Sequence, residues 1–160
     1  MRRSFAAGVV ALSSLLNLGC DDHGHSLGEE ACEHFAEGPV DDVTAGASVD
    51  APVDGGREHA RVDLTLGVVG EEAVGYIAFA TEAGDHAFYF DAAVALELTD
   101  ASGAAVPVLT SGATDLDCGS VGQWFTFALA DGIYTARIAA DAATTAVSMV
   151  RMSVDGGHDH

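Results

Sequence analysis

Lysine is absent from this chain of 160 residues, and its six basic residues other than histidine are all arginines. Against them stand 25 aspartates and glutamates, which gives a formal net charge of −19 at pH 7. A surface with this charge repels the phosphates of nucleic acids and the anionic headgroups of lipids. We therefore exclude DNA and RNA as binding partners.

Motifs of the common enzyme classes are also missing. The sequence has no His-Glu-x-x-His, no Gly-x-Ser-x-Gly, no phosphate-binding glycine loop and no Cys-x-x-Cys. Each of these patterns places a metal, a nucleophile, a phosphate or a redox thiol at a fixed spacing. Their absence predicts a protein that is not an enzyme.

The longest apolar run lies at the start of the chain. Met1-Arg2-Arg3 is followed by apolar residues 5–18, and the small residue Gly19 precedes Cys20. A basic start, a short apolar stretch and a small residue are the layout of an export signal, and the run is too short for a comfortable membrane span. Residues 1–19 are therefore predicted to be a signal peptide with a helical apolar part.

These residues resemble the signal of bacterial lipoproteins, in which a leucine and two small residues precede a lipid-bearing cysteine. Gly19 and Cys20 match that pattern, whereas Leu16 stands one position before the usual leucine. The resemblance implies cleavage before Cys20, which would then carry a diacylglycerol and an amide-linked acyl chain such as palmitate. Several acyl chains, at about 0.8 kcal/mol per buried methylene, hold a small protein on a bilayer. The alternative, ordinary secretory cleavage, lacks an Ala-x-Ala site here.

Lipid attachment would place the protein in the cell envelope, where its partners are the membrane, through the anchor, and an envelope protein or small ligand. Asp21 and Asp22 directly follow the cysteine, and in some bacteria such residues resemble an inner-membrane retention signal. Because that rule differs between lineages, the inner and the outer membrane both stay open.

The other two cysteines, Cys32 and Cys118, form an even pair in a chain expected to leave the reducing cytosol. A disulfide between them follows from that compartment. Two buried thiols, or pairing with another chain, are the alternatives.

Residues 20–38 are predicted to be an acidic, lipid-anchored spacer with one short helix over 27–37. Ser26 and Glu29 have the spacing of a capping box, and Gly38-Pro39 is a typical stop.

Residues 39–155 show period-two alternation in short runs separated by turn residues, which is typical of half-buried strands. Evenly spaced short strands without a long helical period predict an all-β fold, an antiparallel β-sandwich of about eight strands, Ig-like or jelly-roll-like. The expected strands cover residues 43–49, 61–66, 73–80, 86–90, 94–99, 106–108, 124–129, 133–139 and 145–154, with a polar loop over 110–120.

Part of this region resembles the bacterial pre-peptidase C-terminal type of secreted β-sandwich. The likeness rests on Gly75-Tyr76-Ile77-Ala78-Phe79, on Asp100-Ala101-Ser102-Gly103 and on Asp131-Gly132-Ile133-Tyr134, and it covers about residues 71–154. It implies a binding or accessory domain without catalytic activity.

Histidine pairs stand near both ends of the expected mature chain. His23 and His25 follow the anchor, and His158 and His160 lie in a C-terminal tail over residues 156–160. In an extended segment residues i and i+2 point the same way, so each pair can bind one ion, and imidazole with carboxylate suits Zn²⁺, Cu²⁺ or Ni²⁺. Solvated tails without metal are the alternative.

The remaining histidines have simpler interpretations. His34 lies one helical turn after Glu30 and is predicted to form a surface ion pair with it. We expect His59 in a loop and His86 as a half-buried, hydrogen-bonded residue on the face of Phe88.

Among the aromatic residues, Trp124 alone is expected to face outward, since the alternation places Phe125 and Phe127 inside.

Taken together, the sequence predicts a cell-envelope lipoprotein whose β-sandwich is a non-catalytic binding or structural module. The alternative is a periplasmic or surface protein that binds a transition metal through its terminal histidine pairs. Only in that alternative is a cofactor expected, and it would be zinc or copper.

Overall fold

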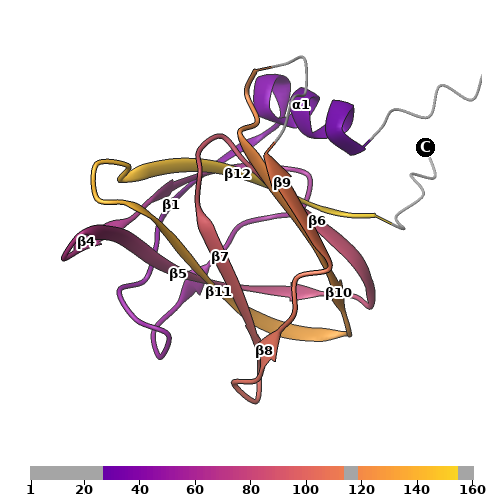
Figure 1. The fold of residues 1–160 in the computed structure, drawn as a ribbon. Coiled ribbons are helices and arrows are strands. Elements are labelled where there is room, and N and C mark those ends of the chain that lie inside the picture. Colours follow the sequence, from indigo (N-terminus) through magenta and orange to yellow (C-terminus); the bar gives the residue numbers. More distant parts are fainter. Residues whose placement is uncertain (1–26, 114–118, 155–160) are drawn as a thin grey trace, which may run out of the picture.

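A computed structural model describes residues 27–113 and 119–154 of the chain. Within them the chain forms one helix and twelve strands (Figure 1). They are α1 (Leu27–Glu37), β1 (Val40–Thr44), β2 (Val53–Asp54), β3 (Arg61–Thr65), β4 (Gly67–Val69), β5 (Glu72–Thr81), β6 (Gly84–Phe90), β7 (Ala95–Asp100), β8 (Ala105–Val106), β9 (Thr110–Ala113), β10 (Gln123–Leu129), β11 (Gly132–Asp141) and β12 (Ala146–Ser153).

The strands form two sheets that pack as a sandwich. Sheet A has the order β1-β3-β12-β6-β10-β9, and sheet B has the order β2-β5-β11-β7-β8. β4 pairs with the start of β5, on the same edge of β5 as β2. The all-β sandwich is confirmed. The number of strands is higher than the expected eight, because β2 and β4 are too short to show an alternating pattern in the sequence and β9 lies in the expected polar loop.

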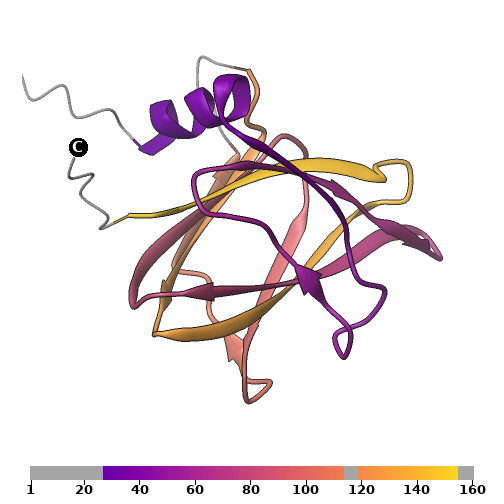
Figure 2. The same ribbon diagram turned by 180° about the vertical axis from the view of Figure 1, so that it is seen from behind.

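Both sheets are mixed rather than purely antiparallel. β1 pairs with β3 in parallel, and β2 pairs with β5 in parallel, while the other pairs are antiparallel. The residues between β1 and β3 make this possible, because they cross from sheet A to sheet B and back and so bring β3 alongside β1 in the same direction (Figure 2).

Two further expectations about strands were wrong. The strand expected over 43–49 ends at Thr44, where the chain turns: a Cβ on Gly46 would lie 2.2 Å from the carbonyl oxygen of Ala51. The expected polar loop after residue 110 begins with β9, which pairs with β10. β9 is an edge strand with mostly exposed side chains, so it shows no apolar alternation.

Alternating side chains from both sheets fill the space between them. The expected inward residues Val62, Leu64 and Leu66 are buried, as are Phe125 and Phe127. Burial of such a side chain contributes about 1.5–3 kcal/mol relative to its exposure. The largest fully buried side chains of this inner core are Phe88, Phe90, Phe127, Leu64, Ile77, Leu98, Ile138 and Met149.

The helix α1 forms a third layer on the outer face of sheet A, against β12 (Figures 1 and 2). Its acidic first turn, Glu29 and Glu30, suits the positive end of the helix dipole, and Gly38 follows its last residue as expected. Within the described residues, no helix has the length and apolar character needed to cross a bilayer.

Under α1 lies a second apolar cluster, called here the outer cluster: Ala31, Phe35, Ala87, Tyr89, Val121, Val150 and Met152. It explains why the last five residues of β6 are all buried, since alternate residues face the inner core and the helix. Trp124 lies on the outer face of sheet A as expected, opposite Tyr89, and it is partly buried because it packs against the outer cluster.

Candidate functional site

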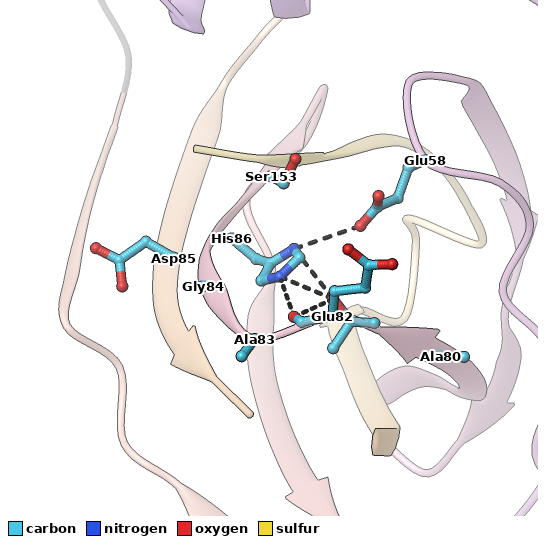
Figure 3. A pocket seen from close by; sticks show the side chains of 9 residues that line it. Glu58, Ala80, Glu82, Ala83, Gly84, Asp85, His86 and Ser153 are labelled. Carbon is cyan, nitrogen blue, oxygen red and sulfur yellow. Dashed lines mark hydrogen bonds and ion pairs between the residues drawn. The ribbon is translucent and has the colours of Figure 1, made fainter. Parts of the chain in front are cut away.

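A polar pocket of about 460 Å³ opens beside the turn between β5 and β6 (Figure 3). Its lining combines this turn with the loop before β3 and the end of β12. The lining residues are Glu58, Ala80, Thr81, Glu82, Ala83, Gly84, Asp85, His86 and Ser153. The volume lies in the range of sites for small ligands.

His86 is the buried histidine of this pocket, with 2 % of its surface exposed. On sheet A it lies opposite Ser153 of β12 and Phe127 of β10, and it points between the sheets. Its Nε2 lies 2.7 Å from Oγ1 of Thr81, the last residue of β5, and 3.0 Å from the carbonyl oxygen of Glu82, in the turn that follows. The expected hydrogen-bonded histidine is confirmed, and its burial is deeper than expected.

Glu58 links His86 to a buried arginine. Its Oε1 lies 3.3 Å from Nδ1 of His86 and 2.6 Å from an Nη1 donor of Arg151. The Arg151 guanidinium also lies over the Phe79 ring, 4.6 Å from its centroid. These contacts join sheet A, sheet B and the loop before β3 at one end of the sandwich.

Burial lowers the pKa of the Arg151 guanidinium, while the charges of Glu58 and Asp54 raise it. Because the ordinary pKa of arginine is far above neutral, Arg151 keeps its positive charge and balances that of Glu58. Glu82 leaves the lining acidic, since no ion pair within residues 27–113 and 119–154 uses its carboxylate. In Figure 3 the carboxylates of Glu58 and Glu82 lie on one side of the imidazole, and Asp85 points away from it.

A second group of polar side chains lies on α1, away from this pocket. Nε2 of His34 is 3.6 Å from Oε1 of Glu30, which confirms the expected ion pair. His59, in the expected loop before β3, brings its Nδ1 to 3.2 Å from the same oxygen. The structure therefore gathers two imidazoles and one carboxylate, the donor types of a transition-metal site.

Most of the residues singled out in the sequence lie outside the described part of the chain. These are Cys20, His23, His25, Cys118, His158 and His160. Cys32 lies on α1 and packs against the outer cluster, which also contains Val121, three residues after Cys118. The lipid attachment, the disulfide and the terminal metal pairs stay predictions.

Sequence reasoning missed the Glu58–Arg151 pair. Arg151 had a signal, because it alternates with Val147 and Met149 and so occupies an inward position of an otherwise apolar strand. Glu58 had no such signal in the sequence, because it lies in a loop whose path is set by the neighbouring strands. The approach of His59 to Glu30 depends on the path of the same loop.

No known family model matches this chain, and no curated protein sequence matches it significantly. The resemblances to bacterial lipoproteins and to pre-peptidase C-terminal sandwiches therefore stay predictions from the residues quoted above.

Proposed function

We propose that this protein is a lipid-anchored component of a bacterial cell envelope whose β-sandwich binds a small cationic ligand without catalysing a reaction. The observation that carries the binding role is the acidic pocket beside the β5–β6 turn. The export and the anchor rest on the signal layout that ends at Cys20.

The chemistry of the pocket favours a cation with several hydrogen-bond donors, such as an alkylamine or a guanidinium compound. Glu82 supplies negative charge, and the Thr81 and Ser153 hydroxyls supply oxygen acceptors. The Glu58–Arg151 pair and the bonds of His86 hold these groups on two sheets, so little ordering is needed when a ligand binds. A small anion would meet like charge there.

Backbone amide shifts in NMR test this binding role. The full-length protein, purified from membranes in detergent, is titrated with putrescine and separately with succinate. We expect putrescine to shift the amides of Ala83, Gly84 and Asp85, and succinate to leave them unchanged. The variant Glu82→Gln should weaken putrescine binding, whereas Glu37→Gln, an exposed carboxylate on α1, should not. Equal responses to both compounds, or none at millimolar concentration, would contradict a cation pocket.

Mass spectrometry of the same preparation tests the anchor. We expect an N-terminal cysteine at position 20 that carries three acyl chains, and we expect Cys20→Ala to move the protein out of the membrane fraction. An intact leader, or a membrane-bound Cys20→Ala protein, would overturn the anchor and leave the pocket experiment unaffected.

A second function, metal binding by the terminal histidine pairs, is favoured by one observation. Leu27 and Val154, the described residues nearest to the two pairs, both pack against the outer cluster and so lie on the same side of the domain. His25 precedes Leu27 by two residues, and His158 follows Val154 by four. Four extended residues reach at most about 14 Å from Val154.

Equilibrium dialysis with Zn²⁺ or Cu²⁺ tests this second function. We expect stoichiometric uptake that falls when either His23 and His25, or His158 and His160, are replaced by alanine. Uptake that is unchanged by both replacements would end it.

A further inference from the structure

We infer that Glu30, His34 and His59 form a binding site for one divalent transition metal ion, of the zinc, copper or nickel class. The site lies on the described domain itself, and it depends neither on the terminal histidine pairs nor on the cation pocket. It would hold the ion between α1 and the loop before β3.

The donor atoms already have the spacing that such an ion needs. Oε1 of Glu30 lies 3.6 Å from Nε2 of His34 and 3.2 Å from Nδ1 of His59, and one donor atom of each residue lies within 4.8 Å of the others. Metal–ligand bonds of about 2.0–2.2 Å in a tetrahedral site give ligand separations of about 3.3–3.6 Å. Small side-chain rotations are therefore enough to close the site.

The three side chains are held in place from two directions. Glu30 and His34 are one turn apart on α1, which is fixed by the burial of Ala31 and Phe35 on sheet A. His59 has φ 56°, and among the described non-glycine residues it alone has a positive φ. Its backbone amide donates to the carbonyl oxygen of Arg151 at 2.9 Å, which ties the left-handed turn to β12.

The site is accessible to solvent, but its three side chains are only partly exposed. The side chains are 20–27 % exposed, and His34 also lines an open hollow of about 630 Å³ along the end of α1. The two imidazoles meet edge to face with centroids 5.4 Å apart. Three protein ligands leave a coordination position for water or for a ligand from another molecule, as in sites that exchange or present their metal.

The negative charge around the site favours a cation. Burial raises the pKa of Tyr89, and the charge of Glu30 raises it further. The negative charge of Glu30 would also attract a divalent ion. Imidazole and carboxylate together suit zinc, copper and nickel rather than calcium or magnesium.

Isothermal titration with Zn²⁺ tests the inference in a background that removes the other histidine pairs. The parent is the full-length protein in which His23, His25, His158 and His160 are all alanine. We expect it to bind one Zn²⁺, and we expect His34→Gln, His59→Asn and Glu30→Gln each to weaken that binding by more than about tenfold, the lower end of what supporting groups around a metal contribute. Asparagine tolerates the left-handed conformation at position 59, so this variant keeps the turn.

The matched control is Glu33→Gln, an exposed carboxylate on the same helix, which should leave Zn²⁺ affinity unchanged. Far-UV circular dichroism without metal shows which variants are folded, and Co²⁺ absorption gives a second measurement. We expect the visible Co²⁺ bands of a low-coordinate site in the parent and their loss in His59→Asn. Absence of Zn²⁺ binding in the folded parent, or folded His34→Gln and His59→Asn variants that bind Zn²⁺ as tightly as the parent, would overturn the inference.

Discussion

At the residue scale, three of the few arginines make contacts that stabilise the fold. Arg61 donates to the carbonyl oxygen of Phe35 in the last turn of α1, and Arg137 pairs with Glu72 across two strands. Arg151 is the extreme case, because it is 4 % exposed and its Nε has no hydrogen-bond partner among the described residues. With so few positive charges, each arginine balances part of a large acidic excess.

Replacement of Arg151 by alanine is expected to destabilise the fold by about 2–4 kcal/mol. It removes the packing on Phe79 and leaves the Glu58 carboxylate beside His86 without its partner, although partial exposure of Glu58 limits the cost. Urea unfolding measures the change. Arg151→Met should cost less, because it keeps the volume, and Arg57→Ala, an exposed pair with Asp41, should barely move the midpoint. Equal losses in Arg151→Ala and Arg57→Ala would contradict this role.

Asp100 is expected to make stability depend on pH. It accepts hydrogen bonds from the Ser102 hydroxyl (2.6 Å) and from the amides of Ser102 and Ala104, and these bonds lower the pKa of its carboxyl below the ordinary 3.8. Because the folded pKa is the lower one, the carboxylate stabilises the fold above pH 3.8, and this contribution is lost as the pH falls through the folded value.

Melting temperatures of the wild type and Asp100→Asn check this linkage. The wild type should melt at the higher temperature near neutral pH, and the difference should shrink as the pH falls below 3.8. Asp42→Asn, at an exposed position of β1, is the control. A difference between wild type and Asp100→Asn that is constant with pH would show that the carboxylate charge is irrelevant.

At the scale of elements, the helix and sheet A depend on each other. The stripe of Ala31 and Phe35 covers Tyr89, Val150 and Met152, which would otherwise expose an apolar patch on the outer face of the sheet. An isolated helix of this length is marginal in water, so α1 gains its stability from that packing.

Phe35→Ala is therefore expected to destabilise the protein by about 3 kcal/mol and to release α1 before the sandwich unfolds. Hydrogen exchange measures this directly, as faster exchange of the α1 amides with little change in β11. Glu33→Ala on the exposed face of the helix should change stability by less than about 0.5 kcal/mol. Protection of α1 that survives Phe35→Ala would mean that another contact holds the helix.

At the scale of the whole molecule, the proposed Cys32–Cys118 disulfide would fix the helix layer to the segment that leads into β10. Val121 belongs to the outer cluster and Cys32 packs against it, which supports this pairing. The same face also carries Leu27 and Val154, so the anchor, the helix and the C-terminal end would all gather on one side of the sandwich, with the cation pocket at the β5–β6 turn.

Cys32→Ser and Cys118→Ser should each destabilise the oxidised protein by up to about 4–5 kcal/mol, the chain-entropy value for a loop of this length. The double variant should be no less stable than either single one, because the same bond is lost in all three. Urea unfolding with and without a reductant provides the measurement. A reductant that leaves the wild-type midpoint unchanged would rule out the disulfide.

Much of this architecture follows from the sequence alone. The alternation of Val62, Leu64 and Leu66 and of Phe125 and Phe127 assigns inner faces, and the capping and stop residues bound α1 at 27–37. Local spacing also predicts the Glu30–His34 pair, since residues one helical turn apart are neighbours wherever the helix lies.

Tertiary structure alone decided which distant residues meet. It placed His59 beside Glu30, Arg151 between Glu58 and Phe79, and Trp124 against the outer cluster. It also set the parallel pairing of β1 with β3. Period and composition report which face a side chain takes on its own element, but they carry no information about which loop crosses that face. Both candidate sites are made where a loop meets an element far away in the sequence, and that meeting is fixed only when the two sheets and α1 pack together.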